Sequence, residues 1–188
     1  MEPIHLLAIY LYSSNETIYK KVNQTLLNWD QNENYHQFIF TLYQAIHLIP
    51  LYKGETYRSV DINFNLNDYI IGKKIKWNSF NVSSLQWSNC GELINNKKRG
   101  IVFIIKNLTA RIISPYSKYP ADCEVVHLPK TEFIITNYYK PSIIALGQQN
   151  IRKTTFAIAD LDLEKACASK ASIIIELEEC DNSLPQIK

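Results

Sequence analysis

The first quarter of the chain carries apolar residues three or four positions apart, a spacing that predicts amphipathic helices over residues 4–50. The sequence SSNE at residues 13–16 has the form of a capping box, with Ser13 as the N-cap and Glu16 reaching back to it. One apolar stripe follows this box, and a second follows a polar break and ends at Pro50. The two stripes consist of Ile18, Val22, Leu26 and Trp29, and of Phe38, Leu42, Ala45, Ile46 and Ile49.

From residue 55 onward the pattern changes to short runs of β-favouring residues, with room for one short helix within Asn63–Ile71. A helical first quarter followed by unevenly spaced strands predicts an α+β domain with antiparallel pairing. The sequence has no Gly-rich phosphate loop and no alternation of strands with helices, which argues against a Rossmann domain. The predicted strands are Thr56–Ile62, Lys74–Asn81, Gly100–Lys106, Ala110–Ser114, Glu124–Leu128, Glu132–Asn137, Ser142–Leu146, Thr154–Ile158 and Ser172–Leu177.

The composition fits one globular domain and argues against several classes of protein. The 188 residues are 46% hydrophobic and 20% charged, so the chain can bury a sizeable core, and we expect a single domain over residues 1–188. A formal charge of +2 with scattered basic residues gives no reason to expect a nucleic-acid partner. No apolar run in the sequence is long enough to span a bilayer.

The sequence gives a limited indication of the compartment and of metal binding. The opening residues MEPIHLLAI include an acidic residue where a signal peptide carries positive charge, which favours a cytoplasmic location. Four Asn-x-Ser/Thr sequons leave secretion open. Cys90, Cys123, Cys167 and Cys180 lack the close pairs of a zinc site, so we expect reduced cysteines and no metal.

Three short segments carry the residues that are best suited to chemistry. The first places Arg58 in the β-favouring run ETYRSVD at residues 55–61. The second, GKKIKWNSFNVSSL at residues 72–85, sets Trp77 and Phe80 among polar residues and ends in hydroxyls. The third, YSKYPADCEVVHLPKTEF at residues 116–133, is a polar turn that ends at Glu124, directly before an apolar run. A carboxylate at the start of a buried strand is held rigidly and remains accessible from the loop side.

In this order along the chain, the three segments resemble the motifs of the mono-ADP-ribosyltransferase family, in its arginine–serine–glutamate branch. That family carries a Tyr-Arg-Gly strand, a Gly-Lys…Trp-x-Ser-Phe-x-Ser-Thr-Ser strand, and a Glu-x-Glu or Gln-x-Glu turn before an apolar strand. The counterparts in this chain are residues 57–59, 72–84 and 122–124. The resemblance implies an ADP-ribosyltransferase-like fold, with a helical N-terminal part followed by a mostly antiparallel, split β-sheet core around an NAD cleft.

The resemblance also implies that NAD is the substrate and that its nicotinamide–ribose bond is broken through an oxocarbenium-like transition state. Glu124 matches the family's catalytic Glu, which holds a ribose hydroxyl and stabilises the developing positive charge. Arg58 matches the Arg that binds the NAD phosphates, where a planar and permanently charged fork suits the oxygens. Further NAD-binding candidates are Ser59, Ser83, Ser84 and Phe80; we expect Phe80 in the core, where it could also border the nicotinamide slot.

Three positions depart from the family pattern. Val82 stands where the family's first Ser of Ser-Thr-Ser hydrogen-bonds the catalytic Glu, so Glu124 loses that contact unless Ser83 or Ser84 replaces it. Ser59 replaces the Gly that follows the motif's Arg. Asp122 stands two residues before Glu124, where a Glu accompanies arginine acceptors in the family, so Asp122 is a second catalytic candidate and favours an arginine target.

The resulting hypothesis is an enzyme that transfers ADP-ribose from NAD to a protein side chain, with arginine favoured, and releases nicotinamide. Tyr119 lies in the turn before Glu124, where the family often places an aromatic residue that contacts the target protein; a packed loop Tyr is the alternative. Two other functions remain open on the same fold. Water as the acceptor would make an NAD glycohydrolase. The absence of a hydroxyl at position 82, where this chain has Val82, would fit a catalytically degenerate module that binds NAD or a protein.

Overall fold

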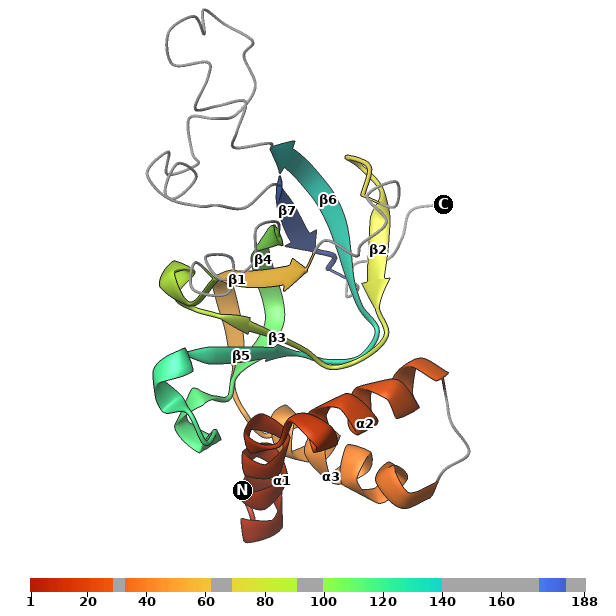
Figure 1. Cartoon of the computed structure of the whole chain (residues 1–188), viewed down its shortest axis with the longest axis vertical. Helices are drawn as coiled ribbons and strands as arrows, with labels where there is room; N and C mark the ends of the chain where they lie inside the picture. The colour runs from red at the N-terminus through yellow and green to blue at the C-terminus, as the bar shows by residue number, and fades with distance from the viewer. Residues whose placement is uncertain (29–32, 62–68, 91–99, 140–172, 182–188) are drawn as a thin grey trace, which may run out of the picture.

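The computed structural model describes residues 1–28, 33–61, 69–90, 100–139 and 173–181, which combine a group of helices with a β-sheet (Figure 1). The helices α1 (Pro3–Ser14), α2 (Glu16–Asn28) and α3 (His36–His47) lie together at one end of the molecule, and the 3-10 helix η1 (Glu33–Tyr35) leads into α3. The predicted helical first quarter and the α+β class are therefore confirmed.

The junction between α1 and α2 differs from the predicted capping box. Pro3 starts α1 early, so Ser13 lies in the last turn of α1, where its hydroxyl donates to the carbonyl three residues before it at 3.0 Å. The cap of α2 is Asn15, whose Oδ1 accepts the N–H groups of Thr17 at 2.9 Å and Ile18 at 3.1 Å. The prediction of Ser13 as N-cap is wrong, because the length of the preceding helix decides which of the available capping residues is used.

The predicted apolar faces of α2 and α3 do form a core, and they share it with α1 and with one face of the sheet. Within the described residues, the buried helical members of this core are joined by residues of the sheet and of the loops next to it. Trp29, the last residue of the predicted α2 stripe, lies outside the described residues. The fully or almost fully buried side chains are Ala8, Ile9, Tyr12, Val22, Leu42, Ala45, Ile46, Ile49, Phe80, Ile113 and Val126.

The sheet has seven described strands in the order β1-β3-β5-β4-β7-β6-β2. All pairings are antiparallel except that of β4 with β7, which is parallel. The apolar residues of β4, β6 and β7 form a second core. The strands are β1 (Leu51–Asp61), β2 (Lys74–Trp77), β3 (Asn81–Ser84), β4 (Gly100–Ile112), β5 (Glu124–His127), β6 (Thr131–Tyr139) and β7 (Ile173–Glu179).

Four of these strands close into a ring that brings the three motif segments together. β1 pairs with both β3 and β4, and β5 also pairs with both β3 and β4. The register sets Ser84 opposite Tyr57 on one side and opposite Glu124 on the other. Residues that are far apart in the sequence thus lie on neighbouring strands, and Arg58 follows directly after Tyr57.

The predicted strand Lys74–Asn81 is wrong, because the structure divides this segment into β2 and β3. β2 pairs with β6, whereas β3 pairs with β1 and β5. The division sends two aromatic side chains into different cores. Trp77 packs against Phe103 and Phe133 in the second core, whereas Phe80 packs among the helices in the first.

Conversely, the predicted strands Gly100–Lys106 and Ala110–Ser114 are one strand, β4. β1 begins at Leu51, earlier than predicted, and pairs along β4 from Arg111 to Gly100, with an irregularity near Gly54. This long partner carries β4 across the polar residues that suggested a break. Most of the predicted Asn63–Ile71 helix, and the predicted strands Ser142–Leu146 and Thr154–Ile158, lie outside the described residues.

Candidate active site

A cleft of about 770 Å³ lies where the helices meet the ring of strands. One wall comes from the end of α1 and the start of α2, and the other from β1, β3 and the turn before β5. Of the residues predicted for the site, seven line this cleft: Arg58, Ser59, Ser83, Ser84, Tyr119, Asp122 and Glu124. The structure therefore brings together most of the side chains that were selected from the sequence.

Glu124 is the first residue of β5, at the predicted junction of a loop with a buried strand. Burial, followed by the negative charge of Asp122, raises the pKa of Glu124 to about 7. The Oε2 atom of Glu124 is buried and accepts no hydrogen bond from the residues that the structure describes. A buried carboxylate oxygen with a free lone pair, at the wall of a cleft, is suited to accept a hydrogen bond from a hydroxyl group of a ligand.

Arg58 approaches the cleft from β1. Its Nη1 donates a hydrogen bond of 2.7 Å to the main-chain carbonyl of Val82, and its guanidinium carbon lies 5.6 Å from the centre of the Trp77 ring. These two contacts fix the plane of the guanidinium. Among the described residues Arg58 forms no ion pair, so its remaining N–H groups can donate to an anionic ligand.

The turn that leads into β5 has an unusual backbone. The 3-10 helix η4 (Pro120–Asp122) ends at Cys123, which has a left-handed conformation with φ of 50°. The Asp122 carbonyl accepts hydrogen bonds from the Ser84 hydroxyl at 2.8 Å and from the Asn89 side chain at 2.7 Å. Tyr119 is 47% exposed at the start of the turn. The turn thus presents Asp122 and Tyr119 at the cleft and is anchored from β3.

The hydroxyls of β3 do not contact the Glu124 carboxylate. Ser83 bonds Thr56 Oγ1 at 2.9 Å, and Ser84 holds the turn as described above. Val82 packs against the helical core. Neither serine therefore takes over the contact that the sequence lacks at Val82.

Ser59 and Phe80 differ in their relation to the cleft. Ser59 lines it, next to the buried Cys90 thiol, whose pKa is raised by burial to about 11. Phe80 is 0% exposed, packs against Tyr12 with the ring centres 5.7 Å apart, and is not part of the cleft wall. Of the two places that the sequence allowed for Phe80, the structure gives the core, so this residue does not border the cleft.

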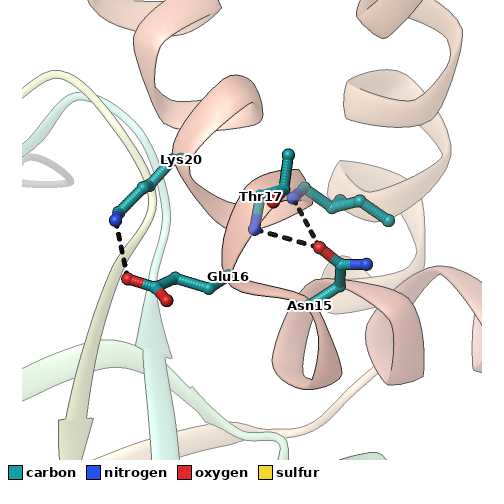
Figure 2. Close-up of polar contacts among 5 residues, drawn as sticks. Asn15, Glu16, Thr17 and Lys20 are labelled. Atoms are coloured by element: carbon teal, nitrogen blue, oxygen red, sulfur yellow. Dashed lines mark hydrogen bonds and ion pairs between the residues drawn. The ribbon is translucent and has the colours of Figure 1, made fainter.

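The helical wall is a part of the site that the sequence did not reveal. Tyr12 and Tyr19 line the cleft with ring centres 5.3 Å apart, and burial raises the pKa of Tyr12 well above its usual value. Asn15 and Glu16 follow at the junction of α1 and α2. Figure 2 shows Asn15 capping α2 and Glu16 paired with Lys20 at 2.6 Å. Helical periodicity indicates which face is buried, but not which end of a helix reaches a cleft formed by distant strands.

A buried polar network behind the cleft was also missed. The Asn107 amide group donates to the Gly54 carbonyl at 2.8 Å and to Thr56 Oγ1 at 3.0 Å, and its Oδ1 lies 2.6 Å from His127 Nε2. Burial lowers the pKa of His127 to about 3. Because Ser83 also bonds Thr56, the network links all four strands of the ring. The only signal in the sequence was a polar residue, Asn107, between two predicted apolar strands.

Other kinds of site are absent from the described ranges. No group of three or more His, Cys, Asp and Glu side chains there could hold a metal ion. No helix in the same ranges is long and apolar enough to cross a membrane. Cys90, Cys123 and Cys180 are free thiols.

Comparison with known proteins identifies the family. The sequence profile described as "NAD:arginine ADP-ribosyltransferase" matches residues 1–179. A search of curated proteins finds no significant match.

Solved structures of ADP-ribosyltransferases share the fold. Vis toxin, an ADP-ribosyltransferase from Vibrio splendidus, superposes with a TM-score of 0.67 at 18% identity, over 100% of this chain and 77% of that chain. HopU1 of Pseudomonas syringae gives 0.66 at 16% identity, over 94% and 76% of the two chains. Plx2a, an ADP-ribosyltransferase toxin from Paenibacillus larvae, gives 0.65 at 16% identity, over 96% and 88%.

The profile match spans most of the sequence, and the superpositions independently give the same fold. The family that the three motif segments resembled is therefore confirmed. The chain belongs to the NAD:arginine ADP-ribosyltransferase family and, with it, to the NAD-dependent transferases.

Proposed function

We propose that this protein transfers ADP-ribose from NAD to an arginine side chain of a target protein and releases nicotinamide. The observation that carries the proposal is the position of Glu124, a buried carboxylate at the start of β5 that shares one cleft with Arg58 and Asp122. The family supplies the reaction class, and these three side chains supply the groups that the reaction requires.

The residues of the cleft fit NAD as a substrate. The cleft volume of about 770 Å³ is suited to a ligand of this size. Glu124 Oε2 is a buried acceptor with no donor among the described residues, and a ribose hydroxyl would satisfy it. The Arg58 guanidinium, held between the Val82 carbonyl and the Trp77 ring, would bind the diphosphate. Ser59, on the strand that carries Arg58, would line the nicotinamide side.

The reaction breaks the bond between the ribose C1′ and the nicotinamide nitrogen. The electron pair of that bond leaves with nicotinamide, which becomes neutral, and positive charge develops on the ribose. Glu124 stabilises this charge when it is ionised, and it orients the ribose through the hydroxyl that it holds. A carboxylate fixed on a strand needs little reorganisation during the reaction, which is the physical advantage of its position.

Asp122 and Tyr119 support a protein acceptor with a guanidinium group. Two hydrogen bonds to its main-chain carbonyl hold the Asp122 backbone at the cleft, where its carboxylate would accept the N–H groups of an arginine. It can also take the proton that the guanidinium loses when its nitrogen attacks C1′. The exposed Tyr119 lies beside it, where a target protein would dock. The related Vis enzyme has been solved in complex with agmatine, a small guanidine.

The experiment measures nicotinamide release from NAD, with and without agmatine as the acceptor. For the full chain we expect agmatine to accelerate release and to become ADP-ribosylated. Glu124→Gln should lower the rate about 10²–10³-fold, because one electrostatic contact to the transition state is lost. Glu178→Gln is the matched control, since Glu178 is an exposed carboxylate on β7, outside the cleft, and its rate should equal that of the unchanged protein.

The two other candidate functions give different results in the same assay. Release that agmatine neither accelerates nor diverts into a labelled product would identify water as the acceptor. NAD binding without any release would identify a catalytically degenerate module. Unchanged release by Glu124→Gln would contradict the catalytic assignment of Glu124 itself.

A further inference from the structure

The turn before β5 is attached at two successive main-chain carbonyls to the end of β3 and the residues that follow it. The Asp122 carbonyl accepts the Asn89 side-chain amide at 2.7 Å and the Ser84 hydroxyl at 2.8 Å. The next carbonyl, that of Cys123, accepts the Leu85 N–H at 3.0 Å. Cys123 has the left-handed φ of 50°, which costs free energy for a residue with a side chain. These contacts therefore stabilise a strained backbone shape.

The hydrogen bonds of Ser84 and Asn89 leave one orientation for each side chain. The Ser84 hydroxyl gives its single proton to the Asp122 carbonyl. Its oxygen accepts the Gln86 N–H at 3.1 Å and the Asn89 amide at 3.0 Å, which uses both lone pairs. The Asn89 nitrogen has two protons and faces two acceptors, the Ser84 oxygen and the Asp122 carbonyl. Ser84 has no second proton with which to replace the bond that Asn89 makes.

The segment that carries Asn89 is packed against β1. Residues 87–90 form a helical turn after β3. Trp87 packs on Tyr57 with the ring centres 5.3 Å apart, and Cys90 is 3% exposed in the same small core. Asn89 lies between these two packed residues and lines the cleft. Its amide is therefore a fixed support for the turn.

The groups proposed for the cleavage of NAD are held by other contacts. The main-chain carbonyl of Glu124 accepts the Ile113 N–H and the Ser114 hydroxyl, each at 3.0 Å. The Arg58 guanidinium donates to a main-chain carbonyl of β3. Neither set includes Asn89, so loss of its amide releases the turn without removing a contact of these two side chains.

We propose that Asn89 is a positioning residue that sets the choice of acceptor, because its amide holds the turn that presents Asp122 to an incoming guanidine. The inference rests on the proposed transfer to a guanidine group. In that transfer a guanidine nitrogen bonds C1′, nicotinamide leaves with the electron pair of its own bond to C1′, and Asp122 takes the proton that the nitrogen loses. In the competing reaction water attacks C1′, which gives free ADP-ribose and a proton. Without the Asn89 amide, water is favoured over the guanidine.

The first measurement is the ratio of ADP-ribosylated agmatine to free ADP-ribose formed from NAD at a fixed agmatine concentration. This ratio does not depend on how much of a variant is folded, so it separates positioning from stability. Asn89→Leu removes both donors and should lower the ratio about tenfold, with little change in KM for NAD. Asn89→Gln keeps an amide and should recover part of the ratio. Asn78→Leu, at an exposed asparagine outside the cleft, should leave it unchanged.

A double-mutant cycle shows whether Asn89 acts through Asp122. In the Asp122→Asn background, Asn89→Leu should lower the ratio no further, because the carboxylate that the turn presents is already absent. A further fall of the same size would mean that Asn89 acts on the acceptor by another route, and the inference would be wrong.

Hydrogen exchange of the Leu85 N–H tests the attachment of the turn without turnover, because this group bonds the Cys123 carbonyl. Asn89→Leu should speed this exchange, and an unchanged rate would contradict the inference. The product ratio separates the inference from the proposed function. If the unchanged protein transfers nothing to agmatine, the proposed function fails, and the acceptor role of Asn89 fails with it. If transfer occurs and Asn89→Leu gives the same ratio, the inference alone is wrong.

Discussion

The guanidinium of Arg58 donates a hydrogen bond of 2.7 Å to the main-chain carbonyl of Val82. Val82 is the position at which the sequence departs from the family motif. It contributes its main-chain carbonyl to this contact, and every residue type has that group. Because the contact depends on the pairing of β1 and β3 and not on a side chain, the change to Val at position 82 leaves the orientation of Arg58 intact.

This geometry predicts the effect of replacing Arg58 by lysine. Arg58→Lys should weaken NAD binding by about 1–3 kcal/mol, because an ammonium cannot keep the Val82 contact and also bind phosphate oxygens through a planar fork. Titration calorimetry with NAD measures the difference. Lys74→Gln removes a positive charge outside the cleft and should leave the affinity unchanged. Equal affinities for the Arg58→Lys and unchanged proteins would assign Arg58 a structural role only.

The raised pKa of Glu124 predicts a pH dependence of activity. Burial and Asp122 shift this pKa from 4.5 up to about 7, and the ionised form is the one that stabilises positive charge. The value of kcat/KM should therefore rise as the pH increases through about 7 and level off above it. Nicotinamide release measured across this range gives the midpoint.

Asp122→Asn provides the internal check on this pH profile. Removing the neighbouring negative charge should move the midpoint to lower pH, whatever it does to the maximal rate. A midpoint near 4.5 in the unchanged protein would show that Glu124 is well solvated in solution, and would contradict burial as the cause of the raised pKa.

The position of Phe80 predicts a separation of stability from binding. Phe80→Leu should lower the free energy of unfolding by about 1–3 kcal/mol, because the fully buried ring packs against Tyr12 and the helical core. NAD affinity should not change, since Phe80 does not line the cleft. Urea denaturation and calorimetry measure the two quantities. Phe40→Leu, at a residue that is 56% exposed, is the control for the substitution itself.

The sequence predicted the side chains of the site more successfully than their surroundings. Arg58, Asp122 and Glu124 could be found because each lies in a short motif whose residue types suit the chemistry, and the structure places all three at one cleft. The contacts that hold them could not be found in this way. Asn89, which donates to the Asp122 carbonyl, was not among the residues that the motifs singled out, and its importance depends on where the chain folds back.

The errors in the predicted strands have a related physical cause. Local alternation of apolar residues cannot show that Trp77 and Phe80, three residues apart, enter two different cores. Nor can it show that β1 is long enough to carry β4 through Asn107 without a break. Both outcomes depend on partners that are distant in the sequence, and in each case tertiary packing overrides the local pattern.

The left-handed backbone at Cys123 gives a further prediction, on the turn before Glu124. A φ of 50° is strained for most side chains and especially for β-branched ones, whereas glycine adopts it freely. Cys123→Gly should therefore keep or increase stability, and Cys123→Val should lower it by about 1–3 kcal/mol. Nicotinamide release should fall for the Val variant, because the turn positions Asp122 and Glu124. Equal unfolding free energies for the two variants would contradict a left-handed residue at this position in solution.

The strand pairings also determine which edges of the sheet are left unpaired. β1 pairs with β4 along its length and with β3 only where Tyr57 lies opposite Ser84, and at the other end of the strand order β2 pairs with β6 alone among the described strands. β2 has only four residues, and its exposed positions are Lys74 and Lys76, the latter paired with Glu132 at 2.6 Å. Short, lysine-bearing edges are poor templates for strand addition from another molecule. The β2 edge is thereby protected against edge-to-edge aggregation.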